Sequence, residues 1–410
     1  MLLFENKKAK LLNVLKIGIN PFKRFVSTGE IKEELDIVSS RKELLENMVD
    51  TIKESRNCVL PLIGRVGAGK THTYWTLKMK LPDYHSFYIS FENIRNKFYY
   101  NIYSEYIENI GVENLRAITN EIIQKYGGQS KKFGFFNVVD IEKVRENMFN
   151  ALKKKFDNKV SLIDGINAIT AHQLDPYKKI EAENWLLGEL MDMRDLSRLG
   201  FSKDLKDENN AYTMLKLLIE HSEEETLLFI DNFEAILSIL EPSSQRKSQI
   251  YDPSWFYDED KGQSDTLDSD NVLDVFFNLH KIDGLSLVIS LNSLDKFDEI
   301  LEIIEKRNRS LLITLKNPYY LPNFEEHDIY EFYQQKMNLF LRNLDFSPAF
   351  IRSLPPYYPV TKQLLKNIFY EANGNPRKII KLLIQLFNDI LYAEEDISTV
   401  LKRFKERLKN

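Results

Sequence analysis

The sequence predicts an α/β protein in which a parallel sheet is followed by an all-helical C-terminal part. Three observations support this fold class. Short apolar runs alternate with helical patterns up to about residue 320, a glycine-rich loop joins the first run to a helix, and only helical patterns remain beyond residue 324. Strands that alternate with helices favour parallel pairing, because parallel neighbours need a crossover connection.

The predicted strands are short runs rich in aliphatic, aromatic and β-branched side chains. They cover residues 58–63, 84–91, 226–230, 285–291 and 311–315. The helices predicted around them cover 40–55, 72–80, 271–282 and 294–306. The C-terminal helices are predicted at 325–343, 361–373, 376–393 and 395–408.

The second and third predicted strands are separated by residues 92–225, which look almost wholly helical, for example at 98–126 and 141–156. We interpret this stretch as a helical insertion in one α/β domain. Residues 241–270 are polar and acidic and predict a flexible loop, whose aromatic residues either dock it or bind a partner. The predicted domains are a lead-in with its helix (1–55), a core (56–323) and a helical lid (324–410).

The composition excludes several classes of protein. Of the 410 residues 43% are hydrophobic and 29% charged, which suits two or three soluble domains. A net charge of −5 gives no global basic field for nucleic acid. The single cysteine, Cys58, excludes an internal disulfide framework, and the six histidines show no metal-ligand spacing. Without a signal peptide or a membrane-length apolar run, we expect a cytoplasmic protein with no membrane partner.

The central motif is a glycine-rich loop with the spacing G-x-x-x-x-G-K-T, which is the phosphate-binding loop pattern. Its glycines let backbone N–H groups face a polyphosphate. Its lysine would reach the β- and γ-phosphates, and its threonine hydroxyl would hold Mg²⁺. The sequence therefore predicts binding of ATP, with Mg²⁺ as cofactor. The predicted cofactor-binding residues are Gly64, Arg65, Val66, Gly67, Ala68, Gly69, Lys70 and Thr71.

An acidic residue, Asp231, ends the predicted strand 226–230 and is the second expected ligand of Mg²⁺ besides Thr71. The next residue is Asn232, which can orient a water molecule but cannot take its proton. Glu234 is the nearest carboxylate and could turn toward the same site from a helix that starts there. Glu234 is thus either the catalytic base or a salt-bridged helix residue.

Five further positions are candidates. Asn292, at the end of strand 285–291, is placed like a polar sensor of the γ-phosphate. Arg307 and Arg309 either reach the nucleotide of a neighbouring subunit or are solvated charges. Arg377, in the G-N-P-R sequence 374–377, opens a helix and could reach back to the phosphates. Arg41, before the loop, is either solvated or a contact to nucleotide or neighbour.

These residues occur in the order and context of the AAA+ ATPases, which the sequence resembles over roughly residues 20–91 and 184–393. The resemblance implies a P-loop NTPase fold with a five-stranded parallel sheet, a helical lid and a nucleotide between them. It also implies that Asn292 is the first sensor and Arg377 the second. Arg307 or Arg309 would be the arginine finger.

Two shorter resemblances are more specific. The N-P-F sequence 20–22 and the helix from Arg41 look like the initiator subgroup, which includes replication-initiator and origin-recognition ATPases. The segment 184–189 is similar to initiator-like ATPases of phage-defence (BREX-type) operons. Three features depart from this pattern. The D-N-F-E sequence 231–234 resembles the signalling (STAND) ATPases, the insertion is long, and no winged-helix domain follows the lid, so DNA binding does not carry over.

Three functions are compatible with the sequence. The first is an ATP-driven switch that hydrolyses slowly and assembles as a homo-oligomer or hetero-complex in replication, transposition or phage defence. The second is a signalling ATPase, and the third is a scaffold that binds nucleotide without turnover. Two basic clusters are either DNA contacts or solvated faces, and the first lies beside aromatic residues. They are Lys131 with Lys132, and Lys153 to Lys155.

Overall fold

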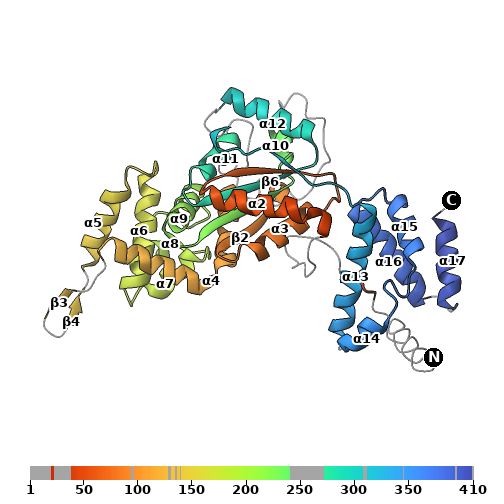
Figure 1. The fold of residues 1–410 in the computed structure, drawn as a ribbon. Coiled ribbons are helices and arrows are strands. Elements are labelled where there is room, and N and C mark those ends of the chain that lie inside the picture. Colours follow the sequence, from red (N-terminus) through yellow and green to blue (C-terminus); the bar gives the residue numbers. More distant parts are fainter. Residues whose placement is uncertain are drawn as a thin grey trace, which may run out of the picture.

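The computed structural model of the chain describes residues 20–22, 38–93, 97–127, 131–133, 136–138, 140–240, 272–307, 312–344, 346–392 and 395–408. A sheet with helices on both faces forms the middle of the molecule (Figure 1). The helical insertion and the C-terminal helices lie at opposite ends of it. Within these residues, none of the helices is both long and apolar enough to cross a membrane.

The central sheet has five parallel strands, the predicted number, and four of them are predicted strands. Its order is β2-β5-β6-β1-β7. The strands are β1 (Val59–Ile63), β2 (Tyr84–Ser90), β5 (Glu225–Asp231), β6 (Leu285–Leu291) and β7 (Tyr319–Tyr320). Because the strands run parallel, the carboxyl ends of β1, β5 and β6 meet at one edge, where ligands of such sheets bind.

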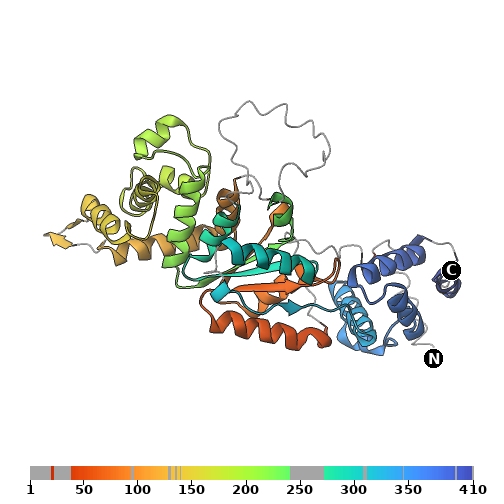
Figure 2. The same ribbon diagram turned by 90° about the horizontal axis from the view of Figure 1, so that it is seen from above.

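The alternation of side chains along each strand produces two cores. On one face, Leu60 and Phe229 pack against α2 (Lys42–Glu54) and α3 (Lys70–Lys80). On the other face, strand residues such as Val59 and Leu228 join the core of the insertion and of α11 (Val272–His280) and α12 (Leu294–Arg307). Figure 2 shows α2 on one side of the sheet and α11 and α12 on the other. The sheet is therefore buried on both faces.

The prediction of a strand at residues 311–315 is wrong for its described residues. Residues 312–313 form a 3-10 turn, and only Leu315 makes a bridge, to Val59. The fifth strand is β7, which pairs with the end of β1. Between the two contacts lies Pro318, which has no N–H to donate and which interrupts this edge strand.

The insertion is mostly helical, as predicted, but it also contains an antiparallel hairpin that the sequence did not reveal. Gly111, with φ of 74°, interrupts the first helix. The hairpin lies at the outer end of the insertion in Figure 1. The elements are α4 (Phe98–Lys125), β3 (Lys131–Phe133), β4 (Phe136–Val138), α5 (Ile141–Leu152), α6 (Lys159–Leu174), α7 (Lys179–Leu186), α8 (Met193–Leu199) and α9 (Glu208–His221).

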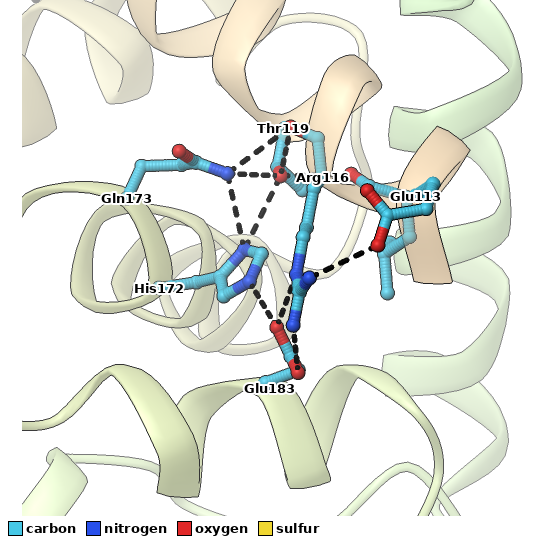
Figure 3. A network of polar contacts seen from close by, with 7 residues as sticks. Glu113, Arg116, Thr119, His172, Gln173 and Glu183 are labelled. Carbon is cyan, nitrogen blue, oxygen red and sulfur yellow. Dashed lines mark hydrogen bonds and ion pairs between the residues drawn. The ribbon is translucent and has the colours of Figure 1, made fainter. Parts of the chain in front are cut away.

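A polar network joins three helices of the insertion (Figure 3). Arg116 of α4 forms two hydrogen bonds to Glu183 of α7, at 2.9 and 2.8 Å. Nε2 of the fully buried His172 lies 2.9 Å from the same carboxylate, and its Nδ1 contacts Thr119 and Gln173. The hydrogen bonds from Arg116 and His172 hold the pKa of Glu183 down at about 2, against partial burial.

The C-terminal helices have a separate apolar core, which also contains Phe22 and Val38 from the N-terminal lead-in. Asn20 donates to the carbonyl of Ile384 at 2.9 Å, so this part of the lead-in is bonded to these helices. The helices are α13 (Glu326–Asn343), α14 (Pro348–Ser353), α15 (Lys362–Glu371), α16 (Pro376–Tyr392) and α17 (Ile397–Arg407). Of these, α14 was not predicted.

Three short elements remain. The 3-10 helix η1 (Ser39–Arg41) precedes α2, and η2 (Phe91–Asn93) follows β2. The helix α10 (Ala235–Leu240) follows β5. The loop predicted at 241–270 lies outside the described residues.

Candidate phosphate-binding site

The glycine-rich loop connects the end of β1 to the start of α3, as the motif requires. Gly67 and Gly69 have φ of 81° and 103°, a left-handed conformation that side-chain-bearing residues rarely adopt. Arg65 and Val66 are exposed at the loop tip, and Ala68 is buried. The loop thus has the strand–turn–helix context of a phosphate-binding loop, with the N-terminus of α3 facing its interior.

Lys70 is the buried cation of the site, with 7% of its surface exposed. Its Nζ donates to the carbonyl of Gly64 at 2.7 Å and to Oδ1 of Asn292 at 2.6 Å. Burial lowers the pKa of Lys70, while Asp231 and Glu234 raise it. Both partners of Nζ are neutral oxygens, so an anionic phosphate oxygen would be a stronger acceptor at the same position.

Asp231 stands at the end of β5 and accepts hydrogen bonds from three neighbouring elements. Thr71 Oγ1 donates to its Oδ2 at 2.9 Å, and the Tyr88 hydroxyl donates to the same oxygen at 2.8 Å. Ser290 of β6 donates to Oδ1. The sequence did not single out Tyr88 or Ser290, although both are polar residues on strands that neighbour β5. These contacts fix the direction of the carboxylate.

The residues fit a magnesium ion that is bound together with a nucleotide. Among the described residues, no group of three or more His, Cys, Asp or Glu side chains is placed to hold a metal. Mg²⁺ in such sites needs only one or two protein oxygens, because phosphates and water supply the remaining ligands. The adjacent oxygens of Thr71 and Asp231 are such a pair.

Glu234 reaches the site through a turn after β5. Asn232 adopts φ of 55°, and Ala235 N donates to Asn232 O at 3.0 Å, so the chain turns into α10 immediately. This turn places Glu234 against Asn292, whose Nδ2 donates to Glu234 Oε1. Burial raises the pKa of Glu234, and its buried Oε2 has no hydrogen-bond partner among the described residues. A half-buried carboxylate is therefore joined to Lys70 through one amide.

The start of α16 lies directly against the loop. Asn375 Nδ2 donates to the carbonyl of Val66 at 2.9 Å, and the Arg377 backbone N–H donates to the carbonyl of Gly67 at 3.2 Å. A Cβ added at Gly67 would lie 2.7 Å from the Cβ of Arg377. The Arg377 charge also lowers the pKa of Lys70. Arg377 thus lies beside the loop, and its expected contact to the phosphates stays a prediction.

Arg41 lies behind the loop, with 3% of its surface exposed. Its guanidinium donates to the carbonyl of Ala68 at 2.8 Å and to that of Pro322, and it lies 4.7 Å from the centre of the Phe324 ring. From the sequence we expect Arg41 to be either solvated or in contact with a nucleotide or a neighbour, and not to bind backbone carbonyls behind the loop. The interpretation of Arg41 as a solvated residue is wrong, because the side chain is buried.

The structure does not test the other predicted arginines, and the basic clusters lie in the insertion. Arg307 is the last residue of α12, and Arg309 lies outside the described residues. The side chains of Lys131 and Lys132 also lie outside them. Lys153 to Lys155 follow α5 in the insertion and take no part in the site. The roles of all these residues stay predictions.

Comparisons with known proteins add little to this geometry. No protein-family model matches the chain, and no curated protein is detectably similar to it. A solved structure, the Walker-type ATPase PABY2304 of Pyrococcus abyssi, is 13% identical, with a TM-score of 0.40. The alignment covers 95% of this chain and 76% of that one. At this TM-score the similarity defines neither the fold nor the function of this chain.

Proposed function

We propose that the chain binds ATP at this loop and hydrolyses it slowly, acting as a nucleotide-dependent switch. The observation that carries the proposal is the connection of the loop lysine to a carboxylate. Lys70 binds Asn292, and Asn292 binds Glu234. The loop lysine, a polar strand end and a carboxylate then lie together at the sheet edge where ligands bind.

In the proposed reaction, Lys70 exchanges its two protein oxygens for phosphate oxygens, which are charged and stronger acceptors. Asn292 then loses one partner, and Glu234 is the carboxylate that orients a water molecule and takes its proton. Its raised pKa makes it a better base than an exposed glutamate. Mg²⁺, held by Thr71 and Asp231, would neutralise charge on the phosphates. Turnover is slow because Glu234 must first be freed from Asn292.

The finer features of the proposal come from the resemblance to AAA+ ATPases. We propose that Arg307 or Arg309 acts as a finger toward the nucleotide of a neighbouring subunit, so the chain works as a homo-oligomer or hetero-complex. We also propose that its process is DNA-associated, such as replication, transposition or phage defence, and that it is cytoplasmic. These features are supported by sequence similarity alone.

One observation favours a second candidate, a STAND-like signalling ATPase or a scaffold that holds nucleotide without turnover. The residue after Asp231 is Asn232, and Glu234 is engaged by Asn292. If nucleotide does not displace this contact, Oε1 of Glu234 stays bound to Asn292, and the buried Oε2 is the carboxylate oxygen left to accept a proton.

Steady-state ATP turnover and ATP binding by the purified chain, with Lys70→Ala as blank and with or without duplex DNA, separate these functions. Turnover above the blank supports the switch, and stimulation by DNA supports the DNA-associated process. Tight binding without turnover supports the scaffold. Equal ATP binding by the wild type and Lys70→Ala would refute nucleotide binding at this loop.

A further inference from the structure

Three successive carbonyls of the phosphate-binding loop are each held by a group from outside the ATPase core. The Val66 carbonyl accepts from the Asn375 side chain and the Gly67 carbonyl from the Arg377 N–H. The Ala68 carbonyl accepts from the Arg41 guanidinium. Asn375 and Arg377 belong to the C-terminal helices, and Arg41 ends the lead-in. The outer side of the loop is thus bound by two other parts of the chain.

Fixing these carbonyls affects how the loop can bind an anion such as phosphate. In each peptide unit the N–H points away from the carbonyl, so a carbonyl that is fixed outward leaves the next N–H directed inward. A run of inward N–H groups forms the concave site in which such loops bind phosphate. The Ala68 N–H is an exception, because it donates to the carbonyl of Arg65 at 2.9 Å. The contacts at Val66 and Ala68 therefore hold the N–H groups of Gly67 and Gly69 inward before a phosphate arrives.

Arg41 differs from the other two groups because its side chain contacts both the phosphate-binding loop and the segment that leads into α13. One guanidinium binds the loop at Ala68, the connecting segment at Pro322 and the face of Phe324, next to the start of α13. The carboxylate of Asp328, at the start of α13, interacts with it electrostatically. Burial lowers the pKa of Arg41 to about 10, so it stays charged at neutral pH. A planar group with five donors suits this position, whereas lysine does not.

We propose that Arg41 is a positioning residue that couples the C-terminal helices to the phosphate-binding loop, so that docking of these helices and nucleotide binding strengthen each other. The proposal rests on ATP binding at this loop. Coupling between two sites is reciprocal. If docked helices hold the loop ready for phosphate, a bound phosphate must in turn hold the helices docked.

The test compares ATP affinity of the wild type, Arg41→Met, Arg41→Lys and Asn375→Ala by calorimetry. Hydrogen exchange at residues 66–69 and at the first turn of α16 is followed with and without ATP. Arg56→Met is the matched control, because Arg56 follows the other end of α2, is 67% exposed and pairs with Asp283 at 3.1 Å. The proposal expects the Kd of ATP to rise about tenfold or more in Arg41→Met, since a charged hydrogen bond is lost.

Arg41→Lys and Asn375→Ala are expected to raise the Kd less, about threefold to tenfold, because each leaves the other loop contacts in place. In the wild type, ATP should slow exchange at the first turn of α16, and this protection should be lost in Arg41→Met. Arg56→Met should bind within about twofold of the wild type, as expected for a surface change. A merely structural arginine would lower the melting temperature without uncoupling ATP from α16.

Unchanged affinity and unchanged ATP protection in Arg41→Met would overturn the inference while leaving the proposed function intact. A wild type that binds no ATP would instead end the proposed function. Should Arg41→Met fail to fold, Arg41→Lys and Asn375→Ala decide, since the lysine keeps the charge and Asn375 is only partly buried. Wild-type affinity in both would then overturn the coupling.

Discussion

The molecule contains two networks of charged and polar side chains. They are similar in residue types but differ in how many of their polar groups are hydrogen-bonded. In the insertion, Arg116, His172 and Glu183 share hydrogen bonds that lower the pKa of the carboxylate. At the loop, Asn292 bridges Lys70 and Glu234 by hydrogen bonds. Burial lowers the pKa of this lysine and raises the pKa of this carboxylate.

This difference distinguishes a structural network from one that can bind a ligand. In the insertion Arg116 and Glu183 face each other directly, so each stabilises the ionised form of the other. At the loop a cation and a carboxylate are buried and separated by a neutral amide, and one carboxylate oxygen has no partner in the described part of the chain. Because the hydrogen-bonding groups of the loop network are not all paired, the network can still accept hydrogen bonds from water and donate them to phosphate.

The largest expected effect comes from removing the carboxylate of the loop network. Glu234→Gln should lower kcat by about 10²–10⁴-fold, the usual contribution of a general base, while ATP affinity stays within a few-fold. In the wild type, kcat should fall on acidification with an apparent pKa above 4.5, the ordinary glutamate value, because burial raises the pKa of Glu234. Steady-state kinetics across pH measure both.

Glu92 provides the matched control for Glu234. It is exposed on η2 and close enough to raise the pKa of Glu234. Glu92→Gln should leave kcat within about threefold, as expected for a surface change. If Glu92→Gln abolishes turnover and Glu234→Gln does not, the base has been assigned to the wrong residue.

The next effect comes from breaking the connection between cation and carboxylate. Asn292→Ala removes an acceptor of Lys70 and a donor to Glu234, and it should lower kcat by about 10–100-fold, as lost hydrogen bonds to charged groups imply. Single-turnover kinetics with pre-bound ATP measure the chemical step. A variant as fast as the wild type would show that Asn292 takes no part in turnover.

The insertion network should respond in the opposite way. Glu183→Ala leaves the buried Nε2 of His172 without its partner, which should lower the free energy of unfolding by about 1–3 kcal/mol. Its ATP affinity and kcat should stay within about twofold, since the network lies away from the loop. Urea unfolding followed by circular dichroism measures the free energy of unfolding. The control variant is Glu113→Ala. Glu113 pairs with the same arginine but is 89% exposed, so its loss should change little.

The smallest effect is a dependence of stability on pH. The pKa of Glu183 is about 2 in the fold and 4.5 ordinarily, so its stabilising effect is complete above pH 4.5 and is lost as the pH falls through about 2. The pKa of His172 is lowered below 6.5 by burial, so acid protonation also disfavours the fold. Glu183→Gln should flatten the acid part of the curve of unfolding free energy against pH. An unchanged curve would contradict the lowered pKa of Glu183.

The sequence predicted the parts of the fold that follow from repeating patterns. The strands β1, β2, β5 and β6 are apolar runs bounded by turns, and the loop motif fixed the position of α3. Because parallel strands end at one edge, Asp231 and Asn292 were expected near Lys70, and the structure places them there. Their chemical roles stay predictions.

What the sequence could not predict depends on partners that carry no residue-type signal. Arg41 binds backbone carbonyls of Ala68 and Pro322, and any residue type supplies such carbonyls. The last strand was misplaced because the apolar run 311–315 looks more like a strand than β7, whose two residues follow Pro318. The hairpin β3–β4 is only three residues long on each side, too short for an alternating pattern.

The order of strands in the sheet also determines when the protein can fold during synthesis. Strand β1 is fully buried, and it pairs with β6 and β7, which are more than 200 residues further along the chain. At about 5–20 residues per second, the ribosome needs roughly 10–50 s to deliver β6 after β1 has been made. Throughout that interval the apolar strand before the loop has neither neighbour, and the early helices α2 and α3 are packing partners already made that can cover one of its faces.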